Sequence, residues 1–218
     1  MQKFNANMLR AYFICGTQDL PAGKTLPEIV EEALQAGITA FQFRDKGTGS
    51  TLSSSERLPM AQRLHELCQQ YQVPFFIDDD VALAKAVNAE GIHVGQSDEA
   101  IQQVINEVGS QMIVGYSCST LAEIKTGDQL AGIDYYGSGP IFTTQSKADA
   151  DPEIGLAGLT NLVTSSKRPI VAIGGITVND LPDIAKTGAS GASVISMIAQ
   201  SSNIKSTVKA MLDVPWQN

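Results

Sequence analysis

Residues 75–98 read FFIDDDVALAKAVNAEGIHVGQSD, and our prediction of the fold starts from this stretch. A short apolar run, 75–77, passes directly into the three acids of 78–80, and a second apolar run, 91–94, is followed by Asp98. If both runs are parallel strands of one sheet, their carboxylates emerge at the same edge of that sheet. Carboxylate oxygens gathered there would bind a hard cation, and magnesium (Mg²⁺) is the ion that we expect.

Short apolar runs recur along the whole chain, and helical patterns lie between them. The runs are too short and too continuously apolar to be half-exposed strands, which favours a parallel sheet covered on its outer face. A chain of 218 residues has the length of one α/β barrel domain. We therefore predict a single-domain (β/α)8 TIM barrel over residues 1–218, with a doubly wound open sheet as the alternative. The apolar runs are 10–15, 40–43, 75–77, 91–94, 112–115, 135–137, 170–173 and 192–195, and the clearest helical segments are 26–36, 54–70, 121–130 and 178–186.

Composition and charge limit the classes of function. The chain is 43% hydrophobic and 17% charged, which is ordinary for a globular protein. Its net charge of −8, with no basic stripe, argues against nucleic-acid binding. No apolar run approaches the length of a membrane span, and residues 1–16 lack a signal-peptide pattern, so we expect a cytoplasmic protein with no membrane partner. The sequence leaves open whether the chain forms a homo-oligomer.

The active site of a barrel lies just after its strands, at their C-terminal ends. After the second apolar run comes QFRDK, 42–46, in which strand alternation places Gln42, Arg44 and Lys46 on one side. The forked donors of Arg and the mobile charge of Lys suit a diphosphate group. The alternative is a solvated loop with scattered charges.

The acids at 78–80 have two interpretations. Asp80 precedes the helical pattern VALAKAV and suits the N-cap of a helix. Because cations able to hold phosphate lie one strand away, we favour a magnesium site for the other acids, since this ion is typically held by one or two carboxylates together with substrate phosphates. His93, inside the apolar run GIHVG, is interpreted as a packed, hydrogen-bonded histidine rather than a metal ligand.

A second anion site is predicted at the same end of the barrel, on the other side of the opening that the C-terminal ends of the strands surround (the mouth). The polar segment 139–155 is long and unpatterned, which is typical of a lid or binding loop, and its TTQSK (143–147) combines hydroxyls with a cation. The glycines of 174–175, and the backbone at 195–196, could approach an anion closely, although a tight turn is the alternative for the glycine pair. Two anion sites in one mouth, one of them with metal, imply two small phosphorylated substrates.

Several motifs match a known family. The chain resembles the thiamine phosphate synthase family through QFRDK (42–46), IDDD and GIHVGQSD (77–98), GYSCST (115–120), GSGPIFTTQSK (137–147) and IGGI (173–176). The resemblance implies a (β/α)8 barrel and a transferase of thiamine biosynthesis. Such an enzyme joins 4-amino-2-methyl-5-hydroxymethylpyrimidine diphosphate to 4-methyl-5-(2-hydroxyethyl)thiazole phosphate. Pyrophosphate is released by a dissociative mechanism, in which the bond from carbon to the diphosphate breaks first.

The resemblance also implies roles for individual residues. Asp79 and Asp98 would hold one Mg²⁺ per subunit, and Arg44, Lys46 and Lys147 would be the catalytic cations that stabilise the leaving pyrophosphate. The pyrimidine diphosphate would bind Gln42, Phe43, Arg44, Asp45, Lys46, Asp78, Ser117 and Lys147, and the thiazole phosphate would bind Thr144, Gln145, Ser146, Gly175, Ile195 and Ser196.

Three positions depart from the family pattern. Asp78 stands where Asn is more common, and a further carboxylate beside a diphosphate repels it unless that carboxylate is metal-bound or protonated. Thr143 replaces a Pro, and Ser119 replaces a His on which the similar thiazole phosphate tautomerases rely. The alternatives to a synthase are therefore such a tautomerase, disfavoured by Ser119, and a barrel that binds thiamine precursors without catalysis.

Overall fold

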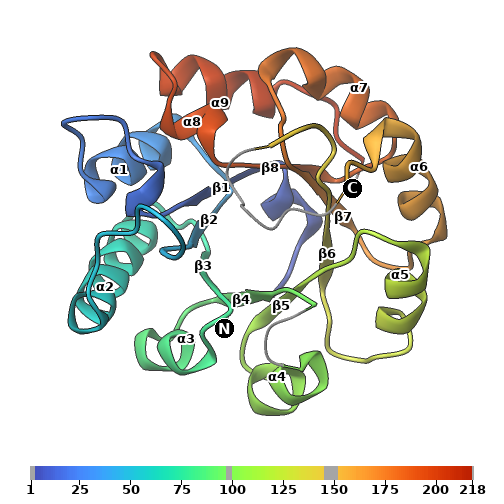
Figure 1. The fold of residues 1–218 in the computed structure, drawn as a ribbon, viewed down its shortest axis with the longest axis horizontal. Helices are drawn as coiled ribbons and strands as arrows, with labels where there is room; N and C mark the ends of the chain where they lie inside the picture. Colours follow the sequence, from blue (N-terminus) through green and yellow to red (C-terminus); the bar gives the residue numbers. More distant parts are fainter. Residues whose placement is uncertain (1–2, 97–99, 145–151, 218) are drawn as a thin grey trace.

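The computed structural model describes residues 3–96, 100–144 and 152–217, in which eight parallel strands form a closed barrel. Each strand pairs with the next one in sequence, and β1 pairs with β8 to close the ring. Figure 1 looks onto this ring, with the helices outside it. The predicted TIM barrel is therefore confirmed against the open-sheet alternative. The strands are β1 (Ala11–Cys15), β2 (Ala40–Phe43), β3 (Phe75–Asp78), β4 (Gly91–Val94), β5 (Ile113–Ser117), β6 (Tyr135–Ser138), β7 (Ile170–Ile173) and β8 (Gly191–Val194).

The helices alternate with these strands. The two predicted at 26–36 and 54–70 have those bounds, the one predicted at 121–130 ends at Gly127, and the one predicted at 178–186 begins with a 3-10 turn. Within the described ranges, no helix is long and apolar enough to cross a membrane. The helices are α1 (Leu26–Ala36), α2 (Ser54–Gln70), α3 (Val81–Val87), α4 (Ile101–Val108), α5 (Leu121–Gly127), α6 (Gly155–Ser165), α7 (Leu181–Lys186), α8 (Ser196–Ala199) and α9 (Ile204–Leu212), with 3-10 turns η1 (Ala6–Leu9), η2 (Thr17–Asp19) and η3 (Val178–Asp180).

Helix α1 illustrates how local sequence sets the bounds of an element. The Glu28 carboxylate accepts a hydrogen bond from the backbone N–H of Thr25 at 2.8 Å, which forms a capping box at the first turn. Pro27 lies in that first turn, where its missing N–H leaves no bond unmade. Gly37 ends the helix with a φ of 96°, a left-handed conformation that glycine adopts without steric cost.

Alternation along the strands sorts apolar side chains into two cores. On β6, Tyr135 lies in the core inside the barrel, while its neighbour Tyr136 lies in the core between strands and helices. The N-terminal segment closes the inner core: the last two residues of η1 are buried in it, and Phe4 stacks on Tyr135 with ring centroids 5.8 Å apart. Figure 1 draws this segment in dark blue inside the ring. The barrel is thus filled from its N-terminal side, which leaves the C-terminal side for a site.

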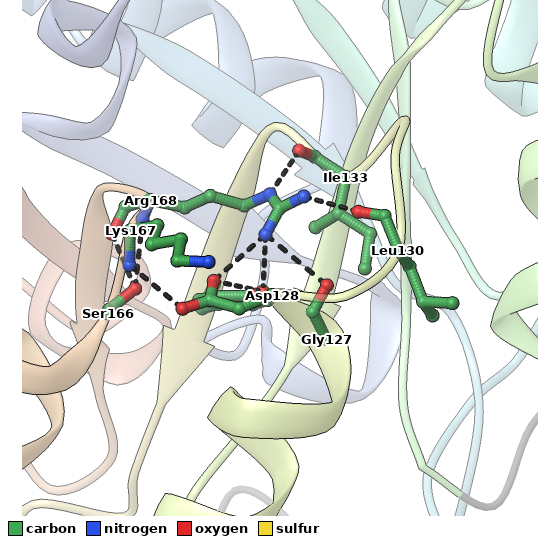
Figure 2. A network of polar contacts seen from close by, with 8 residues as sticks. Gly127, Asp128, Leu130, Ile133, Ser166, Lys167 and Arg168 are labelled. Atoms are coloured by element: carbon green, nitrogen blue, oxygen red, sulfur yellow. Dashed lines mark hydrogen bonds and ion pairs between the residues drawn. The ribbon is translucent and has the colours of Figure 1, made fainter.

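A cluster around Arg168 fixes the connection from α5 to β6, at the N-terminal ends of the strands (Figure 2). The Arg168 guanidinium donates to the carbonyl oxygens of Gly127 at 3.3 Å and of Ile133 at 2.7 Å, and to that of Leu130. It also donates to Asp128 Oδ1 at 2.9 Å. The cluster lies on the face opposite the mouth, where barrels keep residues that serve stability.

Candidate functional site

Two adjoining hollows open at the C-terminal ends of the strands. The first, which we call the charged hollow, has a volume of about 680 Å³ with its mouth included, and Arg44, Lys46, Asp78 and Asp79 are among its lining residues. The second, the hydroxyl hollow, has a volume of about 790 Å³ and is lined mainly by hydroxyl, glycine and apolar residues. Two ligands bound in these hollows would meet at a shared wall. That wall consists of Ser117, Gly137, Ile173, Ser193 and Ile195.

The four charged residues of the charged hollow pair with one another. Lys46 Nζ contacts Asp79 Oδ2 and lies 3.0 Å from Asp78 Oδ2, while Arg44 Nε lies 3.5 Å from the same Asp78 oxygen. Burial by itself would lower the pKa of the Lys46 ammonium, but the two carboxylates outweigh burial and raise it. Two cations and two anions therefore balance in the ligand-free hollow, and a phosphate ligand has to compete with Asp78 and Asp79 for Arg44 and Lys46.

The backbone conformation at Asp79 points the side chains of Asp79 and Asp80 in different directions. Asp79 has a φ of 60°, a left-handed conformation that is uncommon for a residue with a side chain, and its N–H donates to the His93 carbonyl oxygen at 2.9 Å. The next residue, Asp80, turns away from the mouth and accepts a hydrogen bond from the Leu83 N–H at 2.9 Å. The predicted N-cap role of Asp80 is therefore confirmed, and Asp79 is left facing the charged hollow.

The donor set of the charged hollow fits a hard cation. Its carboxylate oxygens come from Asp78 and Asp79, and both contact the Lys46 ammonium, so positive charge is stabilised between them. Among the described residues, no group of three or more His, Cys, Asp or Glu side chains is arranged to hold a metal ion. The other predicted ligand, Asp98, lies outside the described residues.

The predicted substrate residues of β2 divide between two environments. Gln42, Arg44 and Lys46 line the charged hollow, as strand alternation predicts. Phe43 points the other way and is buried in the core between strands and helices. Asp45 is 3% exposed and accepts hydrogen bonds from the Thr17 N–H and hydroxyl, so it anchors two loops to each other. Substrate binding by Phe43 and Asp45 stays a prediction, without support from this geometry.

Hydrogen-bonded polar side chains form the floor of the charged hollow. Gln42 Nε2 donates to the Tyr12 hydroxyl at 2.8 Å, and His93 Nε2 lies 3.0 Å from Ser117 Oγ. His93 Nδ1 lies 3.1 Å from the Tyr135 hydroxyl. The prediction of a packed, hydrogen-bonded His93 is confirmed, and the residue lines the hollow as well.

The hydroxyl hollow contains those predicted thiazole phosphate residues that the structure describes, namely Thr144, Gly175, Ile195 and Ser196. Gly174 and Gly175 have φ values of 99° and 66°, and a Cβ on Gly175 would lie 2.5 Å from the Thr143 carbonyl oxygen. The Phe142 N–H donates to the Gly174 carbonyl oxygen at 3.1 Å. The glycine pair therefore lets the segment after β6 cross over the end of β7. The predicted residues Gln145, Ser146 and Lys147 lie outside the described residues.

Sequence reasoning missed several lining residues. Tyr12 and Ile14 on β1 line the charged hollow, and so does Ser193 on the neighbouring strand β8. Ser119, which the sequence singled out only as a departure from the family pattern, lines the hydroxyl hollow, and its hydroxyl donates to the Gly139 carbonyl oxygen at 2.5 Å. The signal for Tyr12, Ile14 and Ser193 was the period of two along each strand, which places them on the inner face once the barrel is assumed.

Comparison with known proteins finds relatives over nearly the whole chain. Residues 11–198 match the family model described as thiamine monophosphate synthase. A thiamine-phosphate synthase of Lactiplantibacillus plantarum is 59% identical over 96% of this chain and 96% of its own. One of Listeria monocytogenes is 50% identical over 93% of this chain and 95% of its own. Among solved structures, a thiamine phosphate pyrophosphorylase from Pyrococcus furiosus matches with a TM-score of 0.83 and 32% identity, over 95% of both chains.

Proposed function

Because the chain belongs to the thiamine monophosphate synthase family, we propose that it is a transferase that makes thiamine phosphate. The substrates are 4-amino-2-methyl-5-hydroxymethylpyrimidine diphosphate and 4-methyl-5-(2-hydroxyethyl)thiazole phosphate, and the second product is pyrophosphate. As part of the same proposal, the enzyme works in the cytoplasm on these two small molecules.

The adjoining hollows are the observation that carries this proposal. The charged hollow offers Arg44 and Lys46 to a diphosphate, and the hydroxyl hollow offers Thr144 and Ser196 to a monophosphate. The shared wall lets the reacting carbon of one substrate face the ring nitrogen of the other. Holding two reactants in one space in this way removes much of the entropic barrier to their reaction.

We propose that the carbon–oxygen bond to the diphosphate breaks before the thiazole nitrogen attacks. Such a step needs stabilisation of the charge that develops on the leaving pyrophosphate, and little proton transfer. Arg44 and Lys46 supply positive charge from the end of β2, and Lys147 adds a third cation in this proposal. The apolar side chains of Ile14 and Ile173 in the same hollow limit the water that would quench the pyrimidine cation.

Magnesium belongs to the proposal because the charged hollow fits it. We infer that Asp79 holds the ion together with Asp98, as the resemblance implies. When bound, Mg²⁺ supplies charge that stabilises the leaving pyrophosphate. Lys46, whose side chain is 40% exposed, can leave the carboxylates and contact the phosphates instead.

The experiment mixes purified protein with both precursors, with and without Mg²⁺, and follows thiamine phosphate by chromatography. We expect product only when both precursors and Mg²⁺ are present, and absence of product under every condition would contradict the proposal. A parallel reaction with the thiazole carboxylate phosphate alone detects tautomerisation. Precursor binding without any turnover would instead indicate a non-catalytic barrel.

A further inference from the structure

A chain of hydrogen bonds crosses the barrel interior below the charged hollow. Gln42 Nε2 donates to the Tyr12 hydroxyl at 2.8 Å, and the Tyr12 and Tyr135 hydroxyls lie 3.0 Å apart. The Tyr135 hydroxyl lies 3.1 Å from His93 Nδ1, and His93 Nε2 lies 3.0 Å from Ser117 Oγ. The five residues come from five strands, β2, β1, β6, β4 and β5, and both end residues line the hollow. The chain of hydrogen bonds therefore connects two ligand-facing side chains on opposite sides of one site.

The donation from Gln42 gives this chain one direction. Tyr12 is 1% exposed and accepts from the amide, so its own hydrogen needs an acceptor, and the Tyr135 oxygen is the one beside it. Tyr135, which is fully buried, then donates to His93 Nδ1. In the opposite direction Tyr12 would accept twice and leave its hydrogen buried without a partner, which is unfavourable for a buried donor.

The direction fixes the state of the residues at both ends. His93 accepts at Nδ1, so its ring hydrogen is on Nε2 and is donated to Ser117 Oγ. Ser117 Oγ then accepts from His93, and its own hydrogen can be donated to a ligand. At the other end, Gln42 uses its Nε2, so within the described ranges its Oε1 is left to accept from a ligand. Burial also raises the pKa of both tyrosines, which keeps their hydroxyls neutral and able to donate.

We propose that Tyr12, Tyr135 and His93 are positioning residues that hold Gln42 as an acceptor and Ser117 as a donor toward the pyrimidine substrate. The inference rests on the proposed function for the identity of that substrate. The inference goes beyond the proposed function because it assigns a positioning role to three residues below the substrate. Two of them are tyrosines, which no charge or motif singles out. The site then selects a ligand that offers a donor to Gln42 and an acceptor to Ser117.

The first test reads the histidine tautomer in the ligand-free protein by long-range ¹H–¹⁵N NMR. The chain has two histidines, so His65→Gln assigns the His93 ring signals. We expect the Nε2–H tautomer in the wild type, and loss of that preference in Tyr135→Phe. An Nδ1–H tautomer in the wild type, or a tautomer unaffected by Tyr135→Phe, would overturn the inference. This test needs no catalytic activity, so its failure is distinct from failure of the proposed function.

The second test separates positioning from simple packing by kinetics. We expect Tyr135→Phe to lower kcat/KM for the pyrimidine diphosphate about tenfold, the worth of one buried hydrogen bond, while KM for the thiazole phosphate is unchanged. In a Ser117→Ala background the same change should cost less than about threefold, because the hydroxyl whose direction it sets is gone. Equal losses in both backgrounds would assign Tyr135 a packing role and overturn the inference.

Tyr136→Phe is the matched control for the second test. Tyr136 is the next residue on β6, is equally buried, and also loses a bonded hydroxyl, which donates to Asp128 Oδ1 at 3.0 Å. Its ring lies outside the barrel, so we expect lower stability without the change in kcat/KM. Tyr12→Phe changes a second member of the hydrogen-bond chain and replaces Tyr135→Phe in the test if that variant folds poorly. Changes in kcat/KM as large in Tyr136→Phe as in both inner variants would also contradict the inference.

Discussion

The Asp78 carboxylate pairs with the two cations that follow β2, Arg44 and Lys46. The pairing follows from strand register: Phe43 lies opposite Ile77, so the residues that follow them, Arg44 and Asp78, become neighbours. Alternation within β2 predicted which side Arg44 and Lys46 take. It could not predict their partner, because that depends on the register between two strands.

Asp78→Asn tests this pairing. We expect it to lower KM for the pyrimidine diphosphate by about twofold to tenfold, because Arg44 and Lys46 lose a competing anion. Asp79→Asn is the contrasting variant: as a proposed metal ligand it should lower kcat, by about tenfold or more. Steady-state kinetics at saturating Mg²⁺ measure both. Equal losses of kcat in the two variants would mean that Asp78 acts as a metal ligand rather than as a partner of the cations.

Gly175→Ala tests the contact between the hydroxyl hollow and the segment after β6. With a φ of 66° and the Thr143 carbonyl oxygen 2.5 Å from a Cβ, the new methyl group both strains the backbone and clashes. We expect the free energy of unfolding in urea to fall by about 2–4 kcal/mol. Gly23 has a similar φ of 79° and no atom within 4 Å of its Cβ, so Gly23→Ala should cost about 1–2 kcal/mol. Equal losses would exclude the clash as a cause.

At the scale of elements, the hydrophobic period and the caps predicted the bounds of α1 and α2, and the main error has a tertiary cause. The helix predicted at 121–130 ends at Gly127. The carbonyl oxygens of Gly127 and Leu130 accept instead from Arg168, which lies 41 and 38 residues further along the chain. A pattern read over one window of sequence cannot detect a partner at that distance.

Arg168→Met tests how much the cluster of Figure 2 contributes to stability. It leaves Asp128, whose side chain is 8% exposed, without its cation, and it removes donors from three backbone carbonyls. We expect the free energy of unfolding to fall by about 3–5 kcal/mol. Arg168→Lys should recover only part of this, because an ammonium lacks the forked donors. Arg63 is exposed on α2, and Arg63→Met should stay within about 0.5 kcal/mol of the wild type. A similar result for Arg168→Met would contradict the assigned role.

A titratable pair ties α2 to strands β3 and β4. His65 Nε2 lies 3.1 Å from Glu90 Oε1, and Glu90 Oε2 accepts from the Phe75 N–H at 3.0 Å. The hydrogen bond to Glu90 raises the pKa of His65 above its ordinary 6.5, although burial acts in the opposite sense. Burial alone would raise the pKa of Glu90, but the hydrogen bonds from His65 and Phe75 outweigh it and lower that pKa.

The pair makes stability depend on pH. Because the folded pKa of His65 is raised, its contribution is complete below the unfolded value of about 6.5 and is lost as pH rises through the folded pKa. Because the folded pKa of Glu90 is lowered, its contribution is complete above the unfolded value of about 4.3 and is lost as pH falls through the folded pKa. We expect the difference in unfolding free energy between the wild type and His65→Gln to be largest between these values and to shrink as pH rises through the folded pKa of His65. Glu90→Gln should flatten this dependence, and a pH-independent difference would contradict the assignment.

At the scale of the whole molecule, closure of the barrel brings the two hollows together. Residues of β2 and β3 line the charged hollow, while residues after β6, β7 and β8 line the hydroxyl hollow. The alternation of apolar runs predicted the strands, but closure depends on pairing of β1 with β8, where Phe13 lies opposite Val194, and no local pattern reveals that contact. The roles assigned to Asp98, Gln145, Ser146 and Lys147 stay predictions, because these residues lie outside the described part of the chain.

The central claim is that the two phosphorylated precursors condense one to one in the two adjoining hollows. ³¹P NMR of one reaction mixture measures this most directly. The wild-type protein is incubated with Mg²⁺ and equal amounts of the two phosphorylated precursors, and each precursor alone serves as a control. We expect the diphosphate and thiazole phosphate signals to fall together while pyrophosphate and thiamine phosphate rise in equal amounts, with neither product formed from one precursor. Pyrophosphate release without thiamine phosphate, or no change in any signal, would contradict the claim.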